Sequence, residues 1–220
     1  MGAGRAAFDR QAYEQAGKYF RDVINDTNTP SQFLAESYFA YGDTFFNDFL
    51  SDPDKPKTLF DEAIKTFSKI TKDFSTNALA SLAWGRMGEC YFQWNNLNKD
   101  SAALDLATNA FSEVLKSPLA EIASRSQAEV GLGKICEAKG KLDEALEHYA
   151  RILYIGETDE FDPTWTREAG YAAGKLCESR SQWIQAIKVY ERMLAVLPSL
   201  KAPLEKKILL IRTQMGTPKT

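Results

Sequence analysis

Residues 126–153 read SQAEVGLGKICEAKGKLDEALEHYARIL and contain a pattern that recurs along the chain. Gly133 is followed by Ala145 and then, four residues later, by the aromatic residue Tyr149. Four more such trios are Gly4, Ala16 and Phe20; Gly42, Ala63 and Phe67; Gly88, Ala107 and Phe111; and Gly174, Ala186 and Tyr190. Recurrence of this kind predicts a helical repeat protein, in which each unit buries its apolar face only against its neighbours.

The local period of the apolar residues is also helical. Ala63, Ile64, Phe67 and Ile70 recur at three- and four-residue spacing, which places them on one helix face. Prolines stand at segment edges: Pro30, Pro53, Pro56, Pro118, Pro163, Pro198 and Pro203. Because proline suits helix boundaries and first turns but breaks helix interiors, these positions predict about eleven helices and no sheet.

Composition excludes several classes of protein. An apolar content of 44% can fill a core, and a net charge of −3 lacks the basic surplus of nucleic-acid binders. No apolar run reaches the roughly 20 residues of a membrane helix, and residues 1–10 lack the apolar core of a signal peptide. The locally basic stretch 199–220 is interpreted as a solvated helix face and a frayed tail.

The trios belong to a longer pattern that resembles the tetratricopeptide repeat (TPR), whose unit is two antiparallel helices. Residues 81–118 supply its signature most fully, with Trp84, Met87-Gly88, Tyr91, Ala107, Phe111 and Pro118. The resemblance implies an all-α, right-handed superhelical solenoid. The predicted repeats are about 1–29, 30–76, 77–118, 119–162 and 163–198, followed by a closing helix at 199–214 with a polar outer face and a tail at 215–220.

The spacing departs from the family in an informative way. Successive trio glycines lie 38, 46, 45 and 41 residues apart, whereas the TPR unit has roughly 34. The excess predicts long turns near 47–57 and 94–101, and helices about one turn longer between units. This elongated form resembles bacterial envelope TPR proteins of the outer-membrane assembly lipoprotein and Tol–Pal-associated types. The short first unit leads us to expect an excised fragment of a longer protein, without its native signal.

The resemblance also implies a concave groove, lined by the first helix of each repeat, that binds a partner peptide or helix. The family positions fall here on Glu36, Phe39, Asp43, Phe46, Arg86, Glu89, Phe92, Gln93, Gln127, Val130, Lys134, Glu137, Glu168, Tyr171, Lys175 and Glu178. Lys and Asn do not occupy the positions that a carboxylate clamp for chaperone tails requires, so we predict no such clamp.

Aromatic residues recur four positions after the glycines of the first three units, as Phe8, Phe46 and Phe92. Two interpretations remain open. The rings form an exposed stripe for an apolar partner segment, or neighbouring helices cover them as part of the core. Similarly, Phe161 and Trp165 beside the acidic loop 155–163 are either an aromatic anchor or packing between units four and five.

No set of residues predicts catalysis, a cofactor or a metal. His148 is the only histidine and is expected on the surface, and the acid pairs stand at helix starts or in a loop. Cys90, Cys136 and Cys177 have no CxxC spacing and fit small apolar core positions.

The sequence therefore predicts a non-enzymatic module that binds another protein. The alternative is a structural spacer in a longer multidomain chain. The envelope resemblance favours the bacterial periplasm, with the cytoplasm as the alternative.

Overall fold

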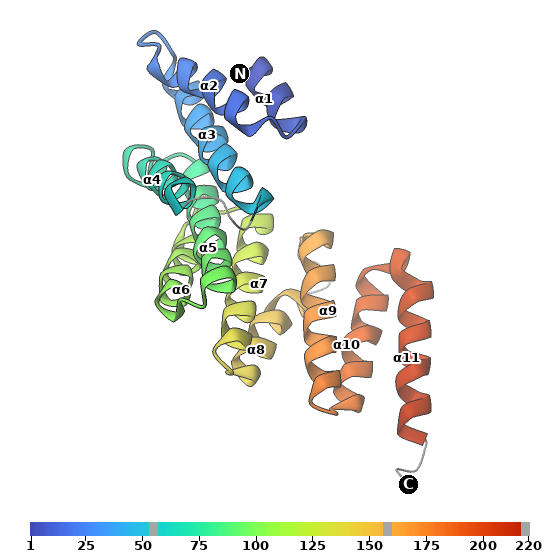
Figure 1. Ribbon diagram of the computed structural model, residues 1–220. Helices are drawn as coiled ribbons and strands as arrows, with labels where there is room; N and C mark the ends of the chain where they lie inside the picture. The colour runs from blue at the N-terminus through green and yellow to red at the C-terminus, as the bar shows by residue number, and fades with distance from the viewer. Residues whose placement is uncertain (53–56, 156–159, 217–220) are drawn as a thin grey trace. The chain divides into compact units, whose positions relative to one another are not determined.

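The structure is a computed structural model that describes residues 1–52, 57–155 and 160–216 (Figure 1). In these residues it contains eleven α-helices, one short 3-10 helix and no strand, which confirms the predicted all-α class. The chain divides into two compact units, Met1–Ala120 and Glu121–Thr220. Each unit is described by itself.

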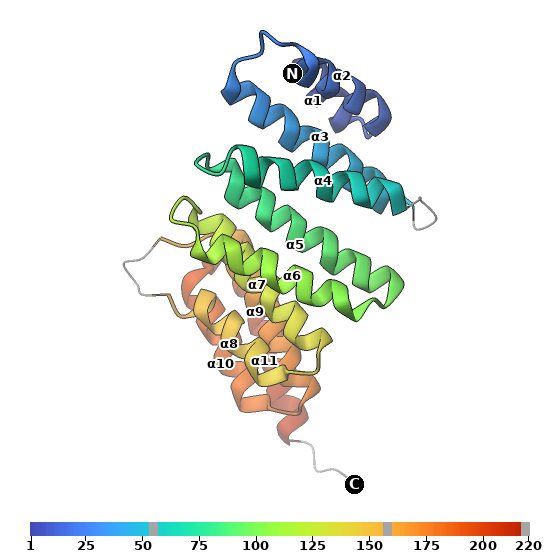
Figure 2. The ribbon, with the colours of Figure 1, turned by 90° about the vertical axis from the view of Figure 1, so that its left-hand side faces the viewer.

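The first unit is a row of six helices in which each helix packs against the next along the chain (Figure 2). They are α1 (Gly2–Asp9), α2 (Tyr13–Asn25), α3 (Ser31–Ser51), α4 (Lys57–Asp73), α5 (Leu79–Asn98) and α6 (Ser101–Lys116).

The second unit continues the same arrangement with five helices and a short 3-10 helix. They are α7 (Ile122–Ala138), α8 (Leu142–Leu153), α9 (Pro163–Ser179), α10 (Trp183–Val196), η1 (Pro198–Leu200) and α11 (Lys201–Gly216). In this unit α9 contacts α7 as well as α8 and α10. Below, α1, α3, α5, α7 and α9 are called first helices, and α2, α4, α6, α8 and α10 second helices.

The turn inside a pair uses a residue in the left-handed backbone region. Gly140, between α7 and α8, has φ 73°, and Ser181, between α9 and α10, has φ 56°. The amide of Lys141 then donates to the carbonyl of Cys136 five residues earlier, at 2.8 Å. This closure is the Schellman arrangement, which reverses the chain and satisfies the last carbonyls of the first helix.

The recurring glycines are the places where the two helices of a pair come closest. A Cβ added to Gly88 would lie 2.8 Å from ring atoms of Phe111, and one added to Gly42 would lie 2.7 Å from Phe67. All five trios place the aromatic ring on the glycine of its own pair. The trio rings therefore pack inside each helix pair.

The predicted long turns are wrong where the structure describes them. Helix α3 continues to Ser51, and α5 continues to Asn98, only three residues before α6 begins at Ser101. Residues 53–56, in the predicted turn 47–57, lie outside the described residues. The additional residues of these two pairs therefore extend the helices instead of lengthening the turns.

An aromatic cluster explains why these helices are long. Phe49 on α3, Phe60 on α4 and Trp94 on α5 pack together, with ring centroids of Phe60 and Trp94 4.8 Å apart. Each ring lies in the last or first turns of its helix, so the cluster buries apolar surface only if those turns form.

The closing helix has a less polar outer face than predicted. Leu204, Ile208 and Ile211 are buried in the core of the second unit, but Leu209 is 63% exposed and Leu210 is 57% exposed. Because one face of α11 packs on α10, the other face carries these two leucines with no further helix over them in the described residues.

Candidate partner-binding groove

Ion pairs connect successive first helices in the first unit. Arg5 Nη2 on α1 lies 3.5 Å from Glu36 Oε2 on α3. Arg86 on α5 reaches back to α3, where its Nε donates to Asp43 Oδ1 at 2.8 Å, and its Nη1 donates to Glu89 Oε2 at 2.8 Å. Glu36, Asp43, Arg86 and Glu89 are predicted groove residues. Ion pairs that include them join α1 to α3 and α3 to α5.

Arg86 also covers an aromatic ring. Its guanidinium carbon lies 5.9 Å from the centroid of Phe39, a geometry that adds a cation–π attraction to the two ion pairs. Burial raises the pKa of Asp43, and the charge of Arg86 only partly offsets that rise. Burial also acts against the charged form of Arg86, but the carboxylates of Asp43 and Glu89 outweigh it and hold the pKa of Arg86 above its usual value. Arg86 therefore pairs with two carboxylates while 34% of its own side chain is exposed.

A pocket of about 320 Å³ lies one step earlier in the first unit, between α1 and α3. Its lining combines apolar side chains with one basic and three acidic ones. The lining residues are Arg5, Phe8, Asp9, Phe20, Glu36, Phe39, Ala40, Asp43 and Leu79. The pocket thus collects the predicted residues Glu36, Phe39 and Asp43 around a cavity large enough for an amino-acid side chain.

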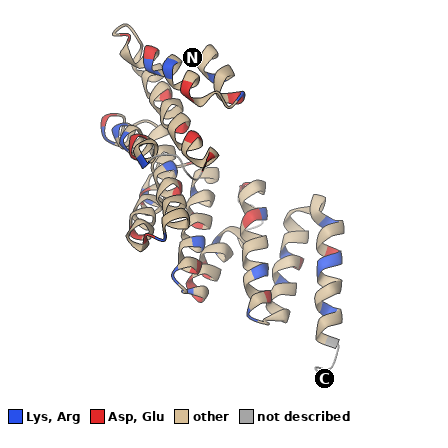
Figure 3. Cartoon of the chain, in the orientation of Figure 1, with Lys and Arg blue, Asp and Glu red and all other residues tan. Residues whose placement is uncertain are grey.

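Ion pairs also join α9 to α7 and to α11 in the second unit. Lys134 Nζ on α7 lies 2.9 Å from Glu168 Oε1 on α9. Lys207 Nζ on α11 lies 3.0 Å from Glu178 Oε1 on α9. The bridges Arg5–Glu36 and Lys134–Glu168 have the same register, since each joins the residue after one trio glycine to the residue six before the next. Figure 3 shows that both basic and acidic residues occur in each unit.

The residue four positions after the trio glycine differs between the two units. In the first unit it is Phe8, Phe46 or Phe92, and the trio aromatic is phenylalanine. In the second unit it is Glu137 or Glu178, and the trio aromatic is tyrosine: Tyr149 Oη donates to Glu137 and Tyr190 Oη donates to Glu178. Burial and these hydrogen bonds raise the pKa of both tyrosines, so they remain protonated donors. The position four residues after the trio glycine therefore carries phenylalanine in the first unit. In the second unit it carries a glutamate that accepts a hydrogen bond from the trio tyrosine.

This exchange predicts a pair of compensating substitutions. Tyr149→Phe should lower the free energy of unfolding by about 1–2 kcal/mol, because it leaves the half-buried Glu137 carboxylate without its donor. Adding Glu137→Phe should restore most of the loss by reproducing the phenylalanine pair of the first unit. Urea unfolding followed by circular dichroism measures both; a double variant that is less stable than Tyr149→Phe would contradict the equivalence.

The open question about the aromatic stripe has a different answer for each ring. Phe46 is 7% exposed and packs in the core with Phe60 and Phe67, so its prediction as a groove residue is wrong. Phe8 lines the pocket, and Phe92 is half-buried. Phe46 is the middle one of the three rings, and it is buried where the long helices α3 and α4 pack together. Among the family positions, Val130 is also core, at 1% exposure.

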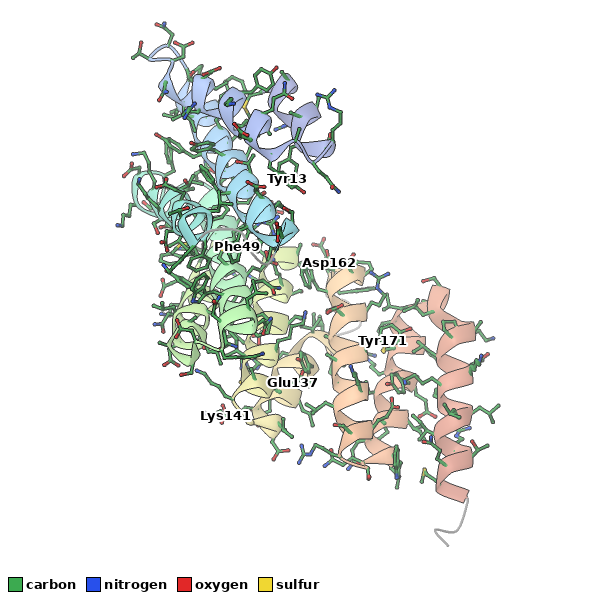
Figure 4. The ribbon with its side chains drawn as sticks, viewed as in Figure 1. Tyr13, Phe49, Glu137, Lys141, Asp162 and Tyr171 are labelled. Atoms are coloured by element: carbon green, nitrogen blue, oxygen red, sulfur yellow. The ribbon has the colours of Figure 1, made fainter. Side chains whose placement is uncertain are left out.

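The other predicted groove residues retain access to solvent. Gln93, Gln127 and Tyr171 are half-buried, and Lys175 is exposed. Tyr171 lies on α9 with its ring centroid 6.5 Å from that of Tyr190 (Figure 4). These residues remain predicted binding residues.

His148 is not the free surface residue predicted from the sequence. Its Nδ1 lies 2.6 Å from Glu129 Oε2, and only 18% of its side chain is exposed. Arg151 Nη1 joins the same carboxylate at 3.2 Å. His148 and Arg151 of α8 therefore both contact Glu129 of α7, and this link between the two helices cannot be found from the sequence of either helix alone.

The two aromatic residues of the predicted anchor differ in their surroundings. Trp165 packs against the core of the second unit, and Phe161 is 40% exposed. Residues 156–159 of the acidic loop lie outside the described residues.

All three cysteines are buried in the core, as predicted. Burial raises the pKa of each thiol, most clearly that of Cys90, which has no exposed surface. We therefore expect iodoacetamide to modify all three slowly in native protein at neutral pH, with Cys90 slowest, and rapidly in urea. Mass spectrometry of a time course measures this; fast native labelling of Cys90 would contradict the packing.

In the described residues, no three His, Cys, Asp or Glu side chains are grouped so that they could hold a metal ion. None of the described helices is both long and apolar enough to cross a membrane.

In each unit these helix pairs, with small residues where the two helices approach, form an all-α helical repeat. Residues 100–163 match the tetratricopeptide repeat family. A similar solved structure is titled "Crystal structure of MamA"; it has 18% sequence identity and a TM-score of 0.59, covering 89% of this chain and 94% of that one. At this identity the likeness concerns the fold. No curated protein sequence matches the chain.

Proposed function

We propose that the protein is a non-enzymatic interaction module that binds a segment of another protein along its first helices. The observation that carries the proposal is the pocket between α1 and α3, which combines the rings of Phe8 and Phe39 with acidic residues in its lining. Surface pockets lined by apolar and charged side chains suit an inserted apolar side chain with polar neighbours.

Two equivalent positions in the first unit carry side chains of different length, and this difference supports an unfilled pocket beside the shorter one. Arg86 stands two residues before Gly88 and fills the step between α3 and α5. Ala40 stands two residues before Gly42, and the pocket lies beside it. A short side chain at this position leaves space that a long basic one would occupy.

Ala40→Arg should therefore weaken binding of a partner segment while leaving the fold intact. A randomised peptide library selected on the wild-type protein supplies ligands, and their affinities for each variant are measured by fluorescence anisotropy. We expect Ala40→Arg to weaken ligands of this pocket at least about tenfold, the effect of losing one buried anchor. The matched control is Ala6→Arg, the same change at an exposed position of α1.

The second candidate function is a structural spacer. The observation that favours it is the pairing of groove charges with one another, as in Lys134–Glu168 and Arg86–Asp43, which stiffens the row of helices without a partner. A library that yields no ligand, or ligands equally bound by Ala40→Arg and Ala6→Arg, would favour the spacer.

We also propose a bacterial envelope as the setting, supported by the elongated helices α3 and α5, of 21 and 20 residues. Fractionation of cells that produce the full-length gene product tests this; recovery only with cytoplasmic proteins would contradict it.

A further inference from the structure

On two helices of this chain, a basic side chain reaches back to the preceding first helix and binds a carboxylate there. Arg86 stands two residues before Gly88 on α5, and its Nε donates to Asp43 Oδ1 on α3 at 2.8 Å. The guanidinium carbon of Arg86 also lies 5.9 Å from the ring centroid of Phe39. A carboxylate and an aromatic ring together form a favourable environment for a basic side chain.

Lys207 on α11 is the second example. Each buried residue of α11 follows a buried residue of α9 at a constant interval of 35: Leu204 after Ala169, Ile208 after Ala173 and Ile211 after Leu176. In this register Lys207 is equivalent to Ala172, which stands two residues before Gly174. Lys207 Nζ lies 3.0 Å from Glu178 Oε1 on α9. This repeat position therefore accommodates a long basic side chain beside the preceding first helix.

On α3 the same position carries Ala40, and the space beside it is open. Ala40 lines the pocket of about 320 Å³ between α1 and α3. Phe8 and Phe39 line this pocket as well, and both are half-buried, so part of each side chain remains accessible. The pocket thus has aromatic surface and room for a side chain, but α3 contains no lysine or arginine that could fill it.

The charged side chains that line the pocket have a negative excess. They are Asp9, Glu36 and Asp43 against Arg5. Asp43 pairs with Arg86, and Glu36 Oε2 lies 3.5 Å from Arg5 Nη2. Asp9 forms no ion pair in the described residues, so one negative charge of the pocket is left without a cation. A partner with a basic side chain would supply that cation.

Helix stability does not explain the place of Asp9. It is the last residue of α1, and it is exposed. A carboxylate at this end of a helix lies close to the negative end of the helix dipole, which disfavours it. Replacing Asp9 by a neutral residue should therefore not destabilise α1, and the effect of Asp9 on a ligand can be measured in an intact fold.

We propose that the pocket beside Ala40 binds a lysine or arginine side chain of the partner segment. The apolar stem of that side chain contacts the rings of Phe8 and Phe39, and its charged end is attracted by Asp9 and Glu36. This inference rests on the proposed function and names the chemistry of the side chain that the pocket selects. Charge complementarity and the example of Arg86 over Phe39 define this occupant.

The first test replaces the charge on the ligand. Peptides that are selected from the randomised library on the wild-type protein, and that bind Ala40→Arg weakly, should share a lysine or arginine at a fixed position. Norleucine in place of that lysine, or citrulline in place of that arginine, keeps most of the stem and removes the charge. We expect this replacement to weaken binding about tenfold in fluorescence anisotropy.

The second test changes the charge of the pocket in both directions. Asp9→Asn should weaken the basic peptides about threefold, and Arg5→Gln should strengthen them by a similar factor, because it removes the positive charge that opposes the ligand. The norleucine and citrulline peptides should respond to neither variant. The matched control is Asp22→Asn, the same change at an exposed acid of α2 outside the pocket lining. Thermal unfolding should show an unchanged or slightly higher midpoint for Asp9→Asn.

The outcomes separate the two proposals. Ligands that bind Ala40→Arg weakly, but tolerate norleucine or citrulline, Asp9→Asn and Arg5→Gln without change, would overturn the basic occupant and retain the proposed function. Equal weakening by Asp9→Asn and Asp22→Asn would also overturn it, because the attraction would then come from the net charge of the unit and not from the pocket. Ligands that bind Ala40→Arg and Ala6→Arg equally would contradict the proposed function itself.

Discussion

Gly88→Ala should lower the free energy of unfolding by about 1–2 kcal/mol, although alanine is normally the better helix former by about 1 kcal/mol. The added methyl group would lie 2.8 Å from three ring atoms of Phe111, which is 2% exposed and has no room to move. The pair α5–α6 would therefore have to separate. The midpoint of urea unfolding, followed by circular dichroism, measures the change.

Gly17→Ala is the matched control in the same unit. A Cβ at Gly17 would have its nearest neighbour, Thr44 Oγ1, at 3.4 Å, which is an ordinary contact distance. We expect this variant to be neutral or slightly stabilised, because only the helix propensity changes. Phe111→Leu should relieve part of the clash, so that the double variant with Gly88→Ala loses less than the sum of the single changes. Equal effects of Gly17→Ala and Gly88→Ala would contradict the close approach of the helices.

Arg86→Met should destabilise the first unit by about 2 kcal/mol at neutral pH, because it removes the cation that pairs with the partly buried carboxylate of Asp43 and with Glu89. The expected loss is smaller than for a fully buried pair, since 34% of the Arg86 side chain is exposed. Methionine retains the apolar stem over Phe39, so the change isolates the charge.

The loss should depend on pH in a defined direction. The pKa of Asp43 is already above its ordinary value because of burial, and removing Arg86 would raise it further. A carboxyl group whose pKa is higher in the folded state binds more protons folded than unfolded, so stability falls as pH rises through that window. The difference between Arg86→Met and the wild type should therefore shrink as pH is lowered from 7 toward about 4.

Two further variants complete the Arg86 experiment. Adding Asp43→Asn and Glu89→Gln to Arg86→Met should recover most of the stability, because no uncompensated charge then remains. Arg10→Met, at an exposed arginine, should change stability by less than about 0.5 kcal/mol. A pH-independent loss, or an equal loss in Arg10→Met, would show that the ion pairs of Arg86 do not stabilise the unit.

The sequence was informative about the fold because the fold depends on local repetition. The glycine, alanine and aromatic of each trio predicted the paired helices, and the structure places each ring on the glycine of its own pair. The long turns were mispredicted because residue counts alone do not distinguish a longer loop from a longer helix. The cluster of Phe49, Phe60 and Trp94, which decides this, joins three different helices.

The candidate site was less accessible from the sequence. Glu36, Phe39 and Asp43 were found by family position and do line one pocket, but Phe46 from the same helix is core. Ala40 and Ala172 were missed altogether. Both are small residues two positions before a trio glycine. At the equivalent positions, Arg86 on α5 pairs with Asp43 on α3 and Lys207 on α11 pairs with Glu178 on α9, and only the structure shows these pairs.

The sequence by itself determined that this protein is a row of helix pairs, because close packing at each glycine is a short-range requirement that every repeat must meet. Only the tertiary structure decided which groove side chains are free and which are paired, since that depends on residues one repeat away, at distances set by helix packing. Lys207 pairs with Glu178, whereas Ala172 at the equivalent position of α9 cannot form such a pair, and this difference is visible only when the facing helices are seen together.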